Sequence, residues 1–291
     1  MAEEVTGIIG GTGLGDLLAG HLTDTEFHDV DTPFGRPSMP ILVGRIGQRH
    51  VAFLNRHGKG HKLCPSEVPF AANIFALKKL GVRAVISTGA VGSLREESAP
   101  GELVLVDQFI DKTFKRQSSF FGGFGAVHCE MAEPVCARLR KILIEAAKEI
   151  NVKTHPKGTY VCMEGPQFST RAESLMHRSW GGDLIGMTAM PEAKLAREAQ
   201  MCYALVALAS DYDCWRLHDT QKSKQSLLQE ITQNLSAATN NCLKLIKAVL
   251  QGPAKLVSEE CSCRKSLELA VWTDPNHIDA DAKKRLSVLF E

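Results

Sequence analysis

Short hydrophobic runs alternate with longer segments of helical period along most of the 291-residue chain. The runs expected to be strands lie at residues 7–11, 40–58 (two strands with a turn at Gly47), 83–94, 102–110, 157–165 and 203–213. The segments expected to be helices lie at residues 68–82, 133–152, 174–187 (a helix followed by a short strand), 191–201 and 222–250. Because these elements alternate without a linker, we predict a single α/β domain with a mixed central β-sheet flanked by helices.

The pattern changes after Gly252 and Pro253. The remaining segment contains a Cys-Ser-Cys triplet, an apolar LELAVW run and a final LSVLF. Apolar residues of this kind need a surface that covers them. We therefore divide the chain into a main domain at residues 1–252 and a C-terminal extension at residues 253–291, which packs on that domain or on a neighbouring subunit.

The bulk composition is that of a globular protein without a strongly charged partner. Hydrophobic residues make up 44% of the chain, charged residues 23%, and the formal net charge is +1. This balance argues against nucleic acid as a partner, and no apolar run is long enough to predict a membrane span. The N-terminus has two early acids and no secretory pattern, and the nine cysteines are an odd number in a chain of ordinary size. We expect a cytoplasmic protein with reduced thiols.

Three glycine-rich segments follow predicted strands and could surround an anion. The first, at residues 8–16, offers main-chain N–H groups and the hydroxyl of Thr12. The second, at residues 55–62, places Arg56 and His57 directly after a strand, and a guanidinium suits a phosphate dianion. The third, at residues 87–96, places N–H donors at the carboxyl end of a strand, where α/β proteins bind ligands. The alternatives are a tight turn, a solvated basic turn and packing of small residues under a loop.

Three later segments carry side chains suited to a nucleoside. Residues 163–174 include Phe168, a flat ring for stacking, and residues 186–193 include Met187 and Thr188. For both segments core packing is the alternative. Asp211 and Asp213 leave an apolar strand at a spacing of two, which puts both on one face of an extended chain. Two such acids repel each other, which raises one pKa and produces a proton donor; a helix cap beside a solvated acid is the alternative.

The order of these segments is more specific than any one of them. The chain resembles the methylthioadenosine phosphorylases, within the trimeric branch of the purine nucleoside phosphorylases, over roughly residues 5 to 250. The matching motifs are, in order, GGTGL, RHG, TGAVGSL, MAEP, EGPQFSTRAE, GMTAMPE and SDYDCW. The resemblance implies a purine nucleoside phosphorylase-like fold and a homo-oligomer, either a trimer or a dimer of trimers.

The resemblance also implies roles for individual positions. Those of the phosphate site are Thr12, Arg56, His57, Gly89, Ala90 and Thr188. Gly89 stands where family members often carry Thr or Ser, so that it offers only its main-chain N–H. Those of the nucleoside site are Met187 at the ribose, Phe168 beside the purine, Asp211 and Asp213 at the purine edge, His128 at the 5′ end of an adjacent subunit's substrate, and Leu289 at the methylthio group.

The implied reaction cleaves 5′-methylthioadenosine with inorganic phosphate, giving adenine and 5-methylthioribose 1-phosphate in methionine and purine salvage. Asp211 and Asp213 are the expected catalytic residues: a protonated Asp211 would donate to purine N7, and Asp213 would accept from the 6-amino group. Superfamily members that prefer inosine or guanosine usually carry Asn where Asp211 stands, so Asp211 favours adenine. Phosphate is a co-substrate, and no cofactor or metal is expected, because no cluster has zinc-ligand spacing.

Other readings remain open at this point. The substrate could be adenosine, inosine, guanosine or methylthioinosine. The glycine loop could serve a binding protein or a dinucleotide enzyme, although its spacing differs from G-x-G-x-x-G. A pseudo-enzyme retained for assembly is a further alternative, opposed by the intact acids and Arg56. Cys261 and Cys263 could pair with each other or with another cysteine, as similar segments do in some heat-stable relatives, or be two free surface thiols.

Overall fold

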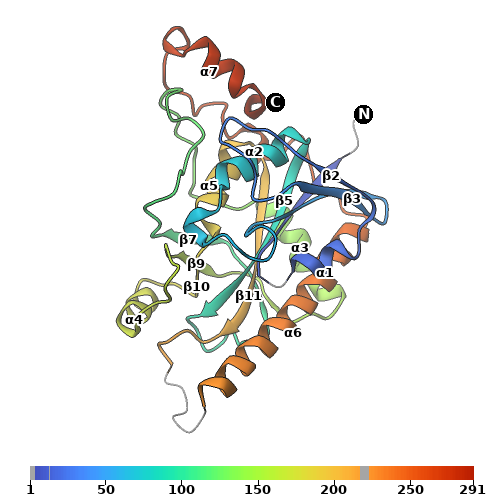
Figure 1. The fold of residues 1–291 in the computed structure, drawn as a ribbon, viewed down its shortest axis with the longest axis vertical. Coiled ribbons are helices and arrows are strands. Elements are labelled where there is room, and N and C mark those ends of the chain that lie inside the picture. The colour runs from blue at the N-terminus through green and yellow to red at the C-terminus, as the bar shows by residue number, and fades with distance from the viewer. Residues whose placement is uncertain (1–3, 13, 217–222) are drawn as a thin grey trace.

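A computed structural model describes residues 4–12, 14–216 and 223–291. In this part of the chain a mixed sheet of 11 strands forms the centre, with helices on both faces (Figure 1). The strands are β1 (Val5–Gly10), β2 (Thr23–His28), β3 (Ile41–Ile46), β4 (Arg49–Asn55), β5 (Val82–Ser93), β6 (Leu103–Leu105), β7 (Gln108–Asp111), β8 (Thr154–His155), β9 (Thr159–Cys162), β10 (Leu184–Gly186) and β11 (Cys202–Asp211). The α-helices are α1 (Gly15–Ala19), α2 (Phe70–Lys79), α3 (Ala137–Glu149), α4 (Arg171–Ser179), α5 (Ala189–Glu198), α6 (Lys224–Gln251) and α7 (Ala280–Arg285).

The strand order is β2-β3-β4-β1-β5-β10-β9-β7, and β11 joins β5 to β6 and β8. Strand β1 is parallel to β4 and β5, and β11 is parallel to β5, whereas β3 and β10 run antiparallel to their neighbours β4 and β5. The predicted α/β class, single domain and mixed sheet are therefore confirmed.

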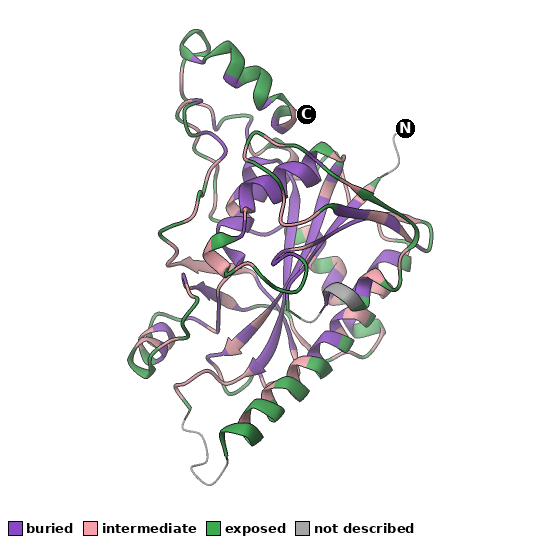
Figure 2. Ribbon diagram, in the orientation of Figure 1, coloured by how far each residue is buried: buried purple, intermediate pink, exposed green. Residues whose placement is uncertain are grey.

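The central strands are buried on both faces because their side chains alternate between two hydrophobic cores. On β5, Val85 belongs to the core that contains α2 and α5, whereas Ala84 and Ile86 belong to the core that contains α3 and α6. Strand β11 alternates in the same way. Figure 2 shows the result as central strands that are buried along most of their length, while much of α6 is exposed. This is why these strands have continuous apolar sequences.

Strand β5 changes neighbours near its carboxyl end. Its residues 82–87 pair with β1, and Gly92 and Ser93 pair with β10. Because Gly92 also pairs with Asp211 of β11, β10 must lie on the side of β5 that β1 occupies earlier. Residues 88–91 therefore have no strand partner on this side among the described residues. The gap in pairing falls within the predicted third glycine segment.

The structure departs from the sequence-based elements in a few places. The single strand expected at residues 102–110 is two strands, β6 and β7, which pair with different neighbours. The short elements α1, β2 and α7 were not predicted. Strand β2 is mostly exposed and has no alternation of apolar and polar residues that would predict a strand.

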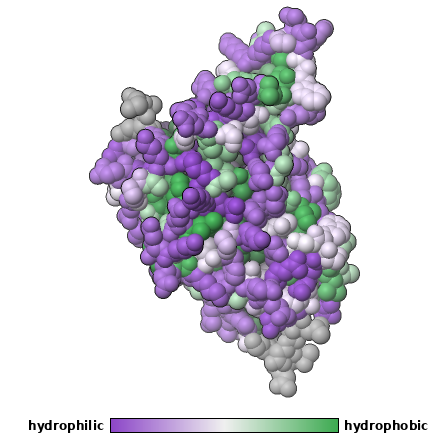
Figure 3. Space-filling view, turned by 180° about the vertical axis from the view of Figure 1, so that it is seen from behind, coloured by the Kyte–Doolittle hydropathy of each residue, from purple (hydrophilic) through white to green (hydrophobic). Residues whose placement is uncertain are grey.

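The C-terminal extension packs on its own chain. Leu286 and Leu289 are fully buried in the core that contains α2, and Leu256 is fully buried in the other core. The extension also leaves large hydrophobic side chains exposed, at Leu269 and Trp272. Figure 3 shows hydrophobic patches among hydrophilic residues, one of them on the protruding end that carries the extension (Figure 1).

All nine cysteines are free, so the disulfide that was one alternative for Cys261 and Cys263 is not formed in this structure. The alternative of two surface thiols is also wrong, because Cys263 is buried and Cys261 is only partly exposed. Among the described residues, no helix is both long enough and apolar enough to span a membrane.

Candidate active site

Arg56 forms the centre of a buried ion pair. It follows β4 directly, and its N–H donates to the Gly10 carbonyl at 3.0 Å, which extends the pairing with β1. Its Nε donates to Glu192 Oε2 at 2.7 Å and its Nη2 to Glu192 Oε1 at 3.0 Å. The two side chains are 1% and 2% exposed. This two-point contact in a dry environment fixes the plane of the guanidinium.

Further hydrogen bonds with residues of β5 and β11 complete the network. Arg56 Nη2 donates to Ser87 Oγ at 2.7 Å, and Arg56 Nη1 donates to the Thr88 carbonyl at 2.9 Å. Glu192 Oε1 also accepts from Ser87 Oγ at 2.5 Å and from the Tyr203 hydroxyl at 2.8 Å. Four of the five guanidinium N–H donors are thus used within the described residues, and the one left is on Nη1. The sequence analysis missed Glu192. A glutamate near the start of a predicted helix is common, so nothing in its local sequence indicates a buried ion pair.

The remaining Nη1 donor lies against the first glycine loop. A Cβ placed on Gly11 would lie 3.0 Å from Nη1 and 2.8 Å from the Thr88 carbonyl oxygen. The Gly11 N–H donates to Thr88 Oγ1 at 3.3 Å. Thr12, the next residue, is exposed. Gly11 is therefore required for the close approach of the loop to Arg56 and β5.

His57 is a neutral imidazole with one defined partner. Burial lowers its pKa from 6.5 to about 4, against the opposing effect of a hydrogen bond to the Leu63 carbonyl. The distance from Nδ1 to that oxygen is 2.8 Å. Since a neutral ring has one N–H, Nδ1 carries the hydrogen and Nε2 is an acceptor. The main-chain N–H of His57 makes no hydrogen bond with any described residue, so it is the donor that His57 offers to an anion.

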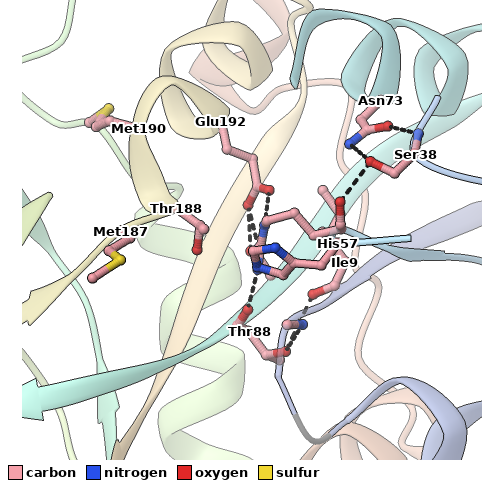
Figure 4. Close-up of polar contacts among 12 residues, drawn as sticks. Ile9, Ser38, His57, Asn73, Thr88, Met187, Thr188, Met190 and Glu192 are labelled. Carbon is pink, nitrogen blue, oxygen red and sulfur yellow. Dashed lines mark hydrogen bonds and ion pairs between the residues drawn. The ribbon is translucent and has the colours of Figure 1, made fainter. Parts of the chain in front are cut away.

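Gly89 and Thr188 face each other beside the unpaired part of β5. Thr188 precedes α5, and its Oγ1 lies 3.8 Å from the position of a Cβ built on Gly89, with no other non-neighbouring atom of the described residues closer. Ala90, the next residue of β5, is partly exposed. Figure 4 shows Met187 and Thr188 on the segment that leads into α5, and Glu192 on α5 itself. The structure therefore brings Arg56, His57, Gly89 and Thr188 to one end of the sheet.

The two acids lie at the end of β11 and contact each other through the main chain. The N–H of Asp213 donates to Asp211 Oδ1 at 2.8 Å, and Ser210 Oγ donates to Asp211 Oδ2 at 2.7 Å. Ser174 Oγ, from α4, donates to Asp213 Oδ2 at 2.5 Å. Burial raises the pKa of Asp213, and the neighbouring charge of Asp211 also raises it. The acid whose pKa is raised is therefore Asp213, whereas the sequence analysis expected the protonated acid to be Asp211.

Strand β5 connects the Arg56 network to the acids. A Cβ on Gly92 would lie 3.3 Å from Asp211 Oδ1 and 3.1 Å from Asp213 Cβ. Gly92 is three residues from Gly89, about 10 Å along an extended strand. Both groups predicted from the sequence therefore lie along the carboxyl-terminal part of one strand.

A second buried ion pair, which sequence reasoning missed, holds the segments beside this strand. Arg116 Nε donates to Glu164 Oε1 at 3.1 Å, and Arg116 Nη1 donates to the carbonyl oxygens of Met187 and Met190. Glu164 accepts from the main-chain N–H of Phe114 at 2.7 Å. Burial opposes ionisation of Glu164, but hydrogen bonds from Ser66 and from main-chain N–H groups, together with Arg116, lower its pKa to about 2. The sequence gives no local signal for this pair, because its members are 48 residues apart.

Of three further predicted substrate contacts, two are exposed and one is buried in the core. Phe168 is 86% exposed, and His128 is exposed beside Trp272, with ring centroids 5.2 Å apart. Leu289 is fully buried in the core of its own chain and has no surface for a ligand, so the structure gives no support to its predicted contact with a methylthio group. Met187 is partly exposed and lies against Gly165, where a Cβ would be 2.6 Å from its sulfur.

In the described part of the chain, one cluster has the geometry to hold a metal. It consists of Cys136, Cys202, Cys261 and Cys263. Cys202 begins β11 and Asp211 ends it, so that about 30 Å of extended strand separates the cluster from the acids. The sequence analysis expected no metal cluster because it considered only the spacing of possible ligands along the sequence. Such spacing cannot show that cysteines far apart in the sequence lie together in the fold.

Comparison with known proteins defines the class. The sequence profile of the Phosphorylase superfamily matches residues 6–251, and the chain belongs to this family. The family expected from the sequence is thereby confirmed.

The most similar relatives include two curated proteins named S-methyl-5′-thioadenosine phosphorylase. The one from Geobacter sulfurreducens is 45% identical over 99% of this chain and 98% of its own length. The one from Saccharolobus solfataricus is 48% identical over 91% of this chain and 96% of its own length. A crystal structure of a methylthioadenosine phosphorylase from an antarctic soil metagenomic library matches all of both chains with a TM-score of 0.88 and 42% identity. The Schistosoma mansoni methylthioadenosine phosphorylase, solved in complex with adenine, matches with a TM-score of 0.78 and 36% identity over 85% of this chain and 91% of that one.

Proposed function

We propose that this protein cleaves 5′-methylthioadenosine with inorganic phosphate, giving adenine and 5-methylthioribose 1-phosphate. Similarity to proteins of that name over almost the full chain supports the substrate. The observation that carries the proposal is the arrangement along one strand, β5: Gly89 lies next to the Arg56 network, Gly92 lies against the Asp211–Asp213 pair, and about 10 Å of extended strand separates these two glycines. A ribosyl group bridges a phosphate and a purine over such a distance. Phosphate is the co-substrate, and no other cofactor takes part.

The phosphate is held mainly by neutral donors that Arg56 positions. Arg56 contributes one N–H, because Glu192, Ser87 and Thr88 occupy the others. The main-chain N–H groups of His57 and Ala90 and the hydroxyl groups of Thr12 and Thr188 supply the remaining donors. Because Glu192 neutralises Arg56, the buried pair carries no net positive charge, and the anion is bound by preorganised N–H and O–H dipoles.

The purine is recognised at its hydrogen-bonding edge by the two acids. A 6-amino group donating to Asp213 favours the ionised form of that carboxyl. We assign to Asp211 the transfer of a proton to purine N7 as the glycosidic bond breaks. A 6-oxopurine would instead place an oxygen against an ionised carboxylate, with a loss of about 1–3 kcal/mol.

The nucleoside half of the site is completed by a second subunit. Phe168, His128 and Trp272 are exposed in the single chain, and large exposed rings are typical of surfaces that become covered. A trimer, or a dimer of trimers, would bring His128 of a neighbouring chain to the 5′ end of the substrate. We place this enzyme in the cytoplasm, in methionine and purine salvage.

The test is product analysis with and without phosphate on a panel of 5′-methylthioadenosine, adenosine, inosine and methylthioinosine. Wild-type protein should release adenine from methylthioadenosine only when phosphate is present. In Asp211→Asn, the ratio of kcat/KM for methylthioadenosine to that for methylthioinosine should fall about ten-fold or more. Asp281→Asn, at an exposed position of α7, is the matched control and should keep the wild-type ratio. An unchanged purine ranking in Asp211→Asn would exclude the reading role of that residue.

A further inference from the structure

Four cysteines from three distant parts of the sequence meet on the side of the molecule away from the candidate active site. Cys136 caps the N-terminus of α3, Cys202 begins β11, and Cys261 and Cys263 belong to the C-terminal extension. Their four Sγ atoms all lie within 4.8 Å of one another. Cys136, Cys202 and Cys263 are buried and Cys261 is partly exposed, so that the cluster is almost closed to solvent.

The separations suit a shared central ion. Cys261 Sγ lies 3.5 Å from Cys202 Sγ and 3.7 Å from Cys136 Sγ. Four sulfur atoms at about 2.3 Å from a tetrahedral Zn²⁺ are about 3.8 Å from each other. A disulfide would require one pair at about 2 Å, and each sulfur would then have a single partner. In this cluster, by contrast, Cys261 has two sulfur neighbours at similar distances.

We propose that Cys136, Cys202, Cys261 and Cys263 bind one Zn²⁺ ion as a structural tetrathiolate site. Four soft sulfur ligands in a tetrahedral arrangement select zinc over magnesium or calcium. All four ligand positions are filled by protein, which leaves no open position for a substrate or water, so the site is structural and not catalytic.

The surroundings suit the negative charge that four thiolates would keep around one Zn²⁺. The guanidinium Nη1 of Arg197 lies 3.7 Å from Cys263 Sγ, and the main-chain N–H of Leu139, in the first turn of α3, donates to Cys136 Sγ at 3.4 Å. Such outer donors orient metal-bound thiolates and reduce their charge. A helix N-terminus and a buried guanidinium are unfavourable neighbours for a purely apolar thiol cluster but favourable ones for an anionic site.

The function of the ion would be to hold the C-terminal extension on the domain. Arg138, in α3, donates to the carbonyl oxygens of Lys255 and Leu256, which brings the extension alongside this helix. The metal would join the extension to α3 and β11 at a second point. The ion would add to the contacts that the extension already makes through the buried side chains of Leu256, Leu286 and Leu289.

The first experiment measures metal and thiols in the full-length protein purified without chelator. Elemental analysis should give about one zinc per chain, and thiol titration in denaturant with chelator should give all nine cysteines. Replacement of zinc by Co²⁺ should produce the intense thiolate-to-cobalt absorption of a tetrahedral sulfur site. A zinc-free protein that fails to take up Zn²⁺ or Co²⁺, fewer than nine thiols, or iron in place of zinc would each overturn the proposal.

The second experiment uses variants. In Cys261→Ser/Cys263→Ser the bound zinc should fall to less than about a fifth of the wild-type content, and chelator should no longer lower the thermal midpoint. Cys64→Ser removes an exposed thiol outside the cluster and should retain wild-type zinc. If the double variant does not fold, Cys261→Ser alone decides, because Cys261 is the partly exposed member. Full zinc content in Cys261→Ser, with an unchanged cobalt spectrum, would contradict the four-cysteine site.

Discussion

The two ends of the candidate site differ in how completely a single chain builds them. At the phosphate end, Arg56 and Glu192 are almost fully buried and fixed by partners from β5, α5 and β11. At the nucleoside end, the acids are half-buried, while Phe168 and His128 point to surface positions. At the phosphate end, the charge of Arg56 is compensated by Glu192 within the same chain. At the nucleoside end, exposed side chains are free to contact a ligand or a neighbouring subunit. This difference indicates that anion binding is preorganised by the fold, and that purine and 5′ specificity depend on ligand and neighbouring subunit.

The largest expected effect comes from breaking the buried ion pair at the phosphate end. In Glu192→Gln, Arg56 keeps its burial but loses its counter-charge, which should cost about 3–5 kcal/mol of unfolding free energy. Urea unfolding at pH 7 measures it. The exposed pair Lys141–Glu145, at 3.8 Å on α3, provides the control. Glu145→Gln should change stability by about 0.5 kcal/mol or less. Equal losses in both variants would show that the phosphate end is not preorganised in this way.

A smaller loss of stability, which depends on pH, is expected when the Arg116–Glu164 ion pair beside the candidate site is broken. Because the pKa of Glu164 is lowered from 4.5 to about 2, its contribution to stability is fully present above pH 4.5 and is lost as the pH falls from 4.5 towards 2. Glu164→Gln should therefore be less stable than wild type by about 2 kcal/mol at pH 7. The difference should shrink steadily between pH 4.5 and pH 3. A difference that stays constant across this range would contradict the assigned pKa shift.

The smallest expected effect is a change in phosphate binding on substitution of Gly89, without a change in the fold. Gly89 leaves room for a Cβ, because the nearest non-neighbouring atom of the described residues, Thr188 Oγ1, lies 3.8 Å from that position. Gly89→Thr adds the hydroxyl that many relatives of this kind are expected to have, and should lower KM for phosphate up to about ten-fold through one charge-assisted hydrogen bond.

The matched control for this variant is Gly11→Ala. There a Cβ would meet the Thr88 carbonyl at 2.8 Å, so phosphate binding should weaken. Initial rates at varied phosphate concentration measure both variants. If Gly89→Thr raised KM as much as Gly11→Ala, Gly89 would not face the anion.

The fold was predictable from the sequence wherever a segment is buried on both faces. Strands β5 and β11 read as long apolar runs because alternate side chains enter two different cores. The exposed strand β2 and the two-part segment of β6 and β7 were missed, because their boundaries depend on which strands they pair with. Local pattern carries no information about such pairing.

The site was predictable where a residue type itself implies chemistry. Arg56, His57 and the two acids stood out as charged or titratable groups beside glycines or apolar strands. Glu192, Arg116 and Glu164 did not, because each is defined by a partner far away in the sequence. The four-cysteine cluster is the clearest case, since its members are spread over 127 residues and only folding brings them together.

The most direct test of the whole account is a crystal structure with sulfate, as an unreactive stand-in for phosphate, and 5′-methylthioadenosine. The account predicts sulfate among the main-chain N–H groups of His57 and Ala90 and the hydroxyl of Thr188. It predicts the purine edge on Asp211 and Asp213, with the ribose lying along β5 between them. Sulfate and nucleoside bound at separate places, or a purine that contacts neither acid, would contradict it.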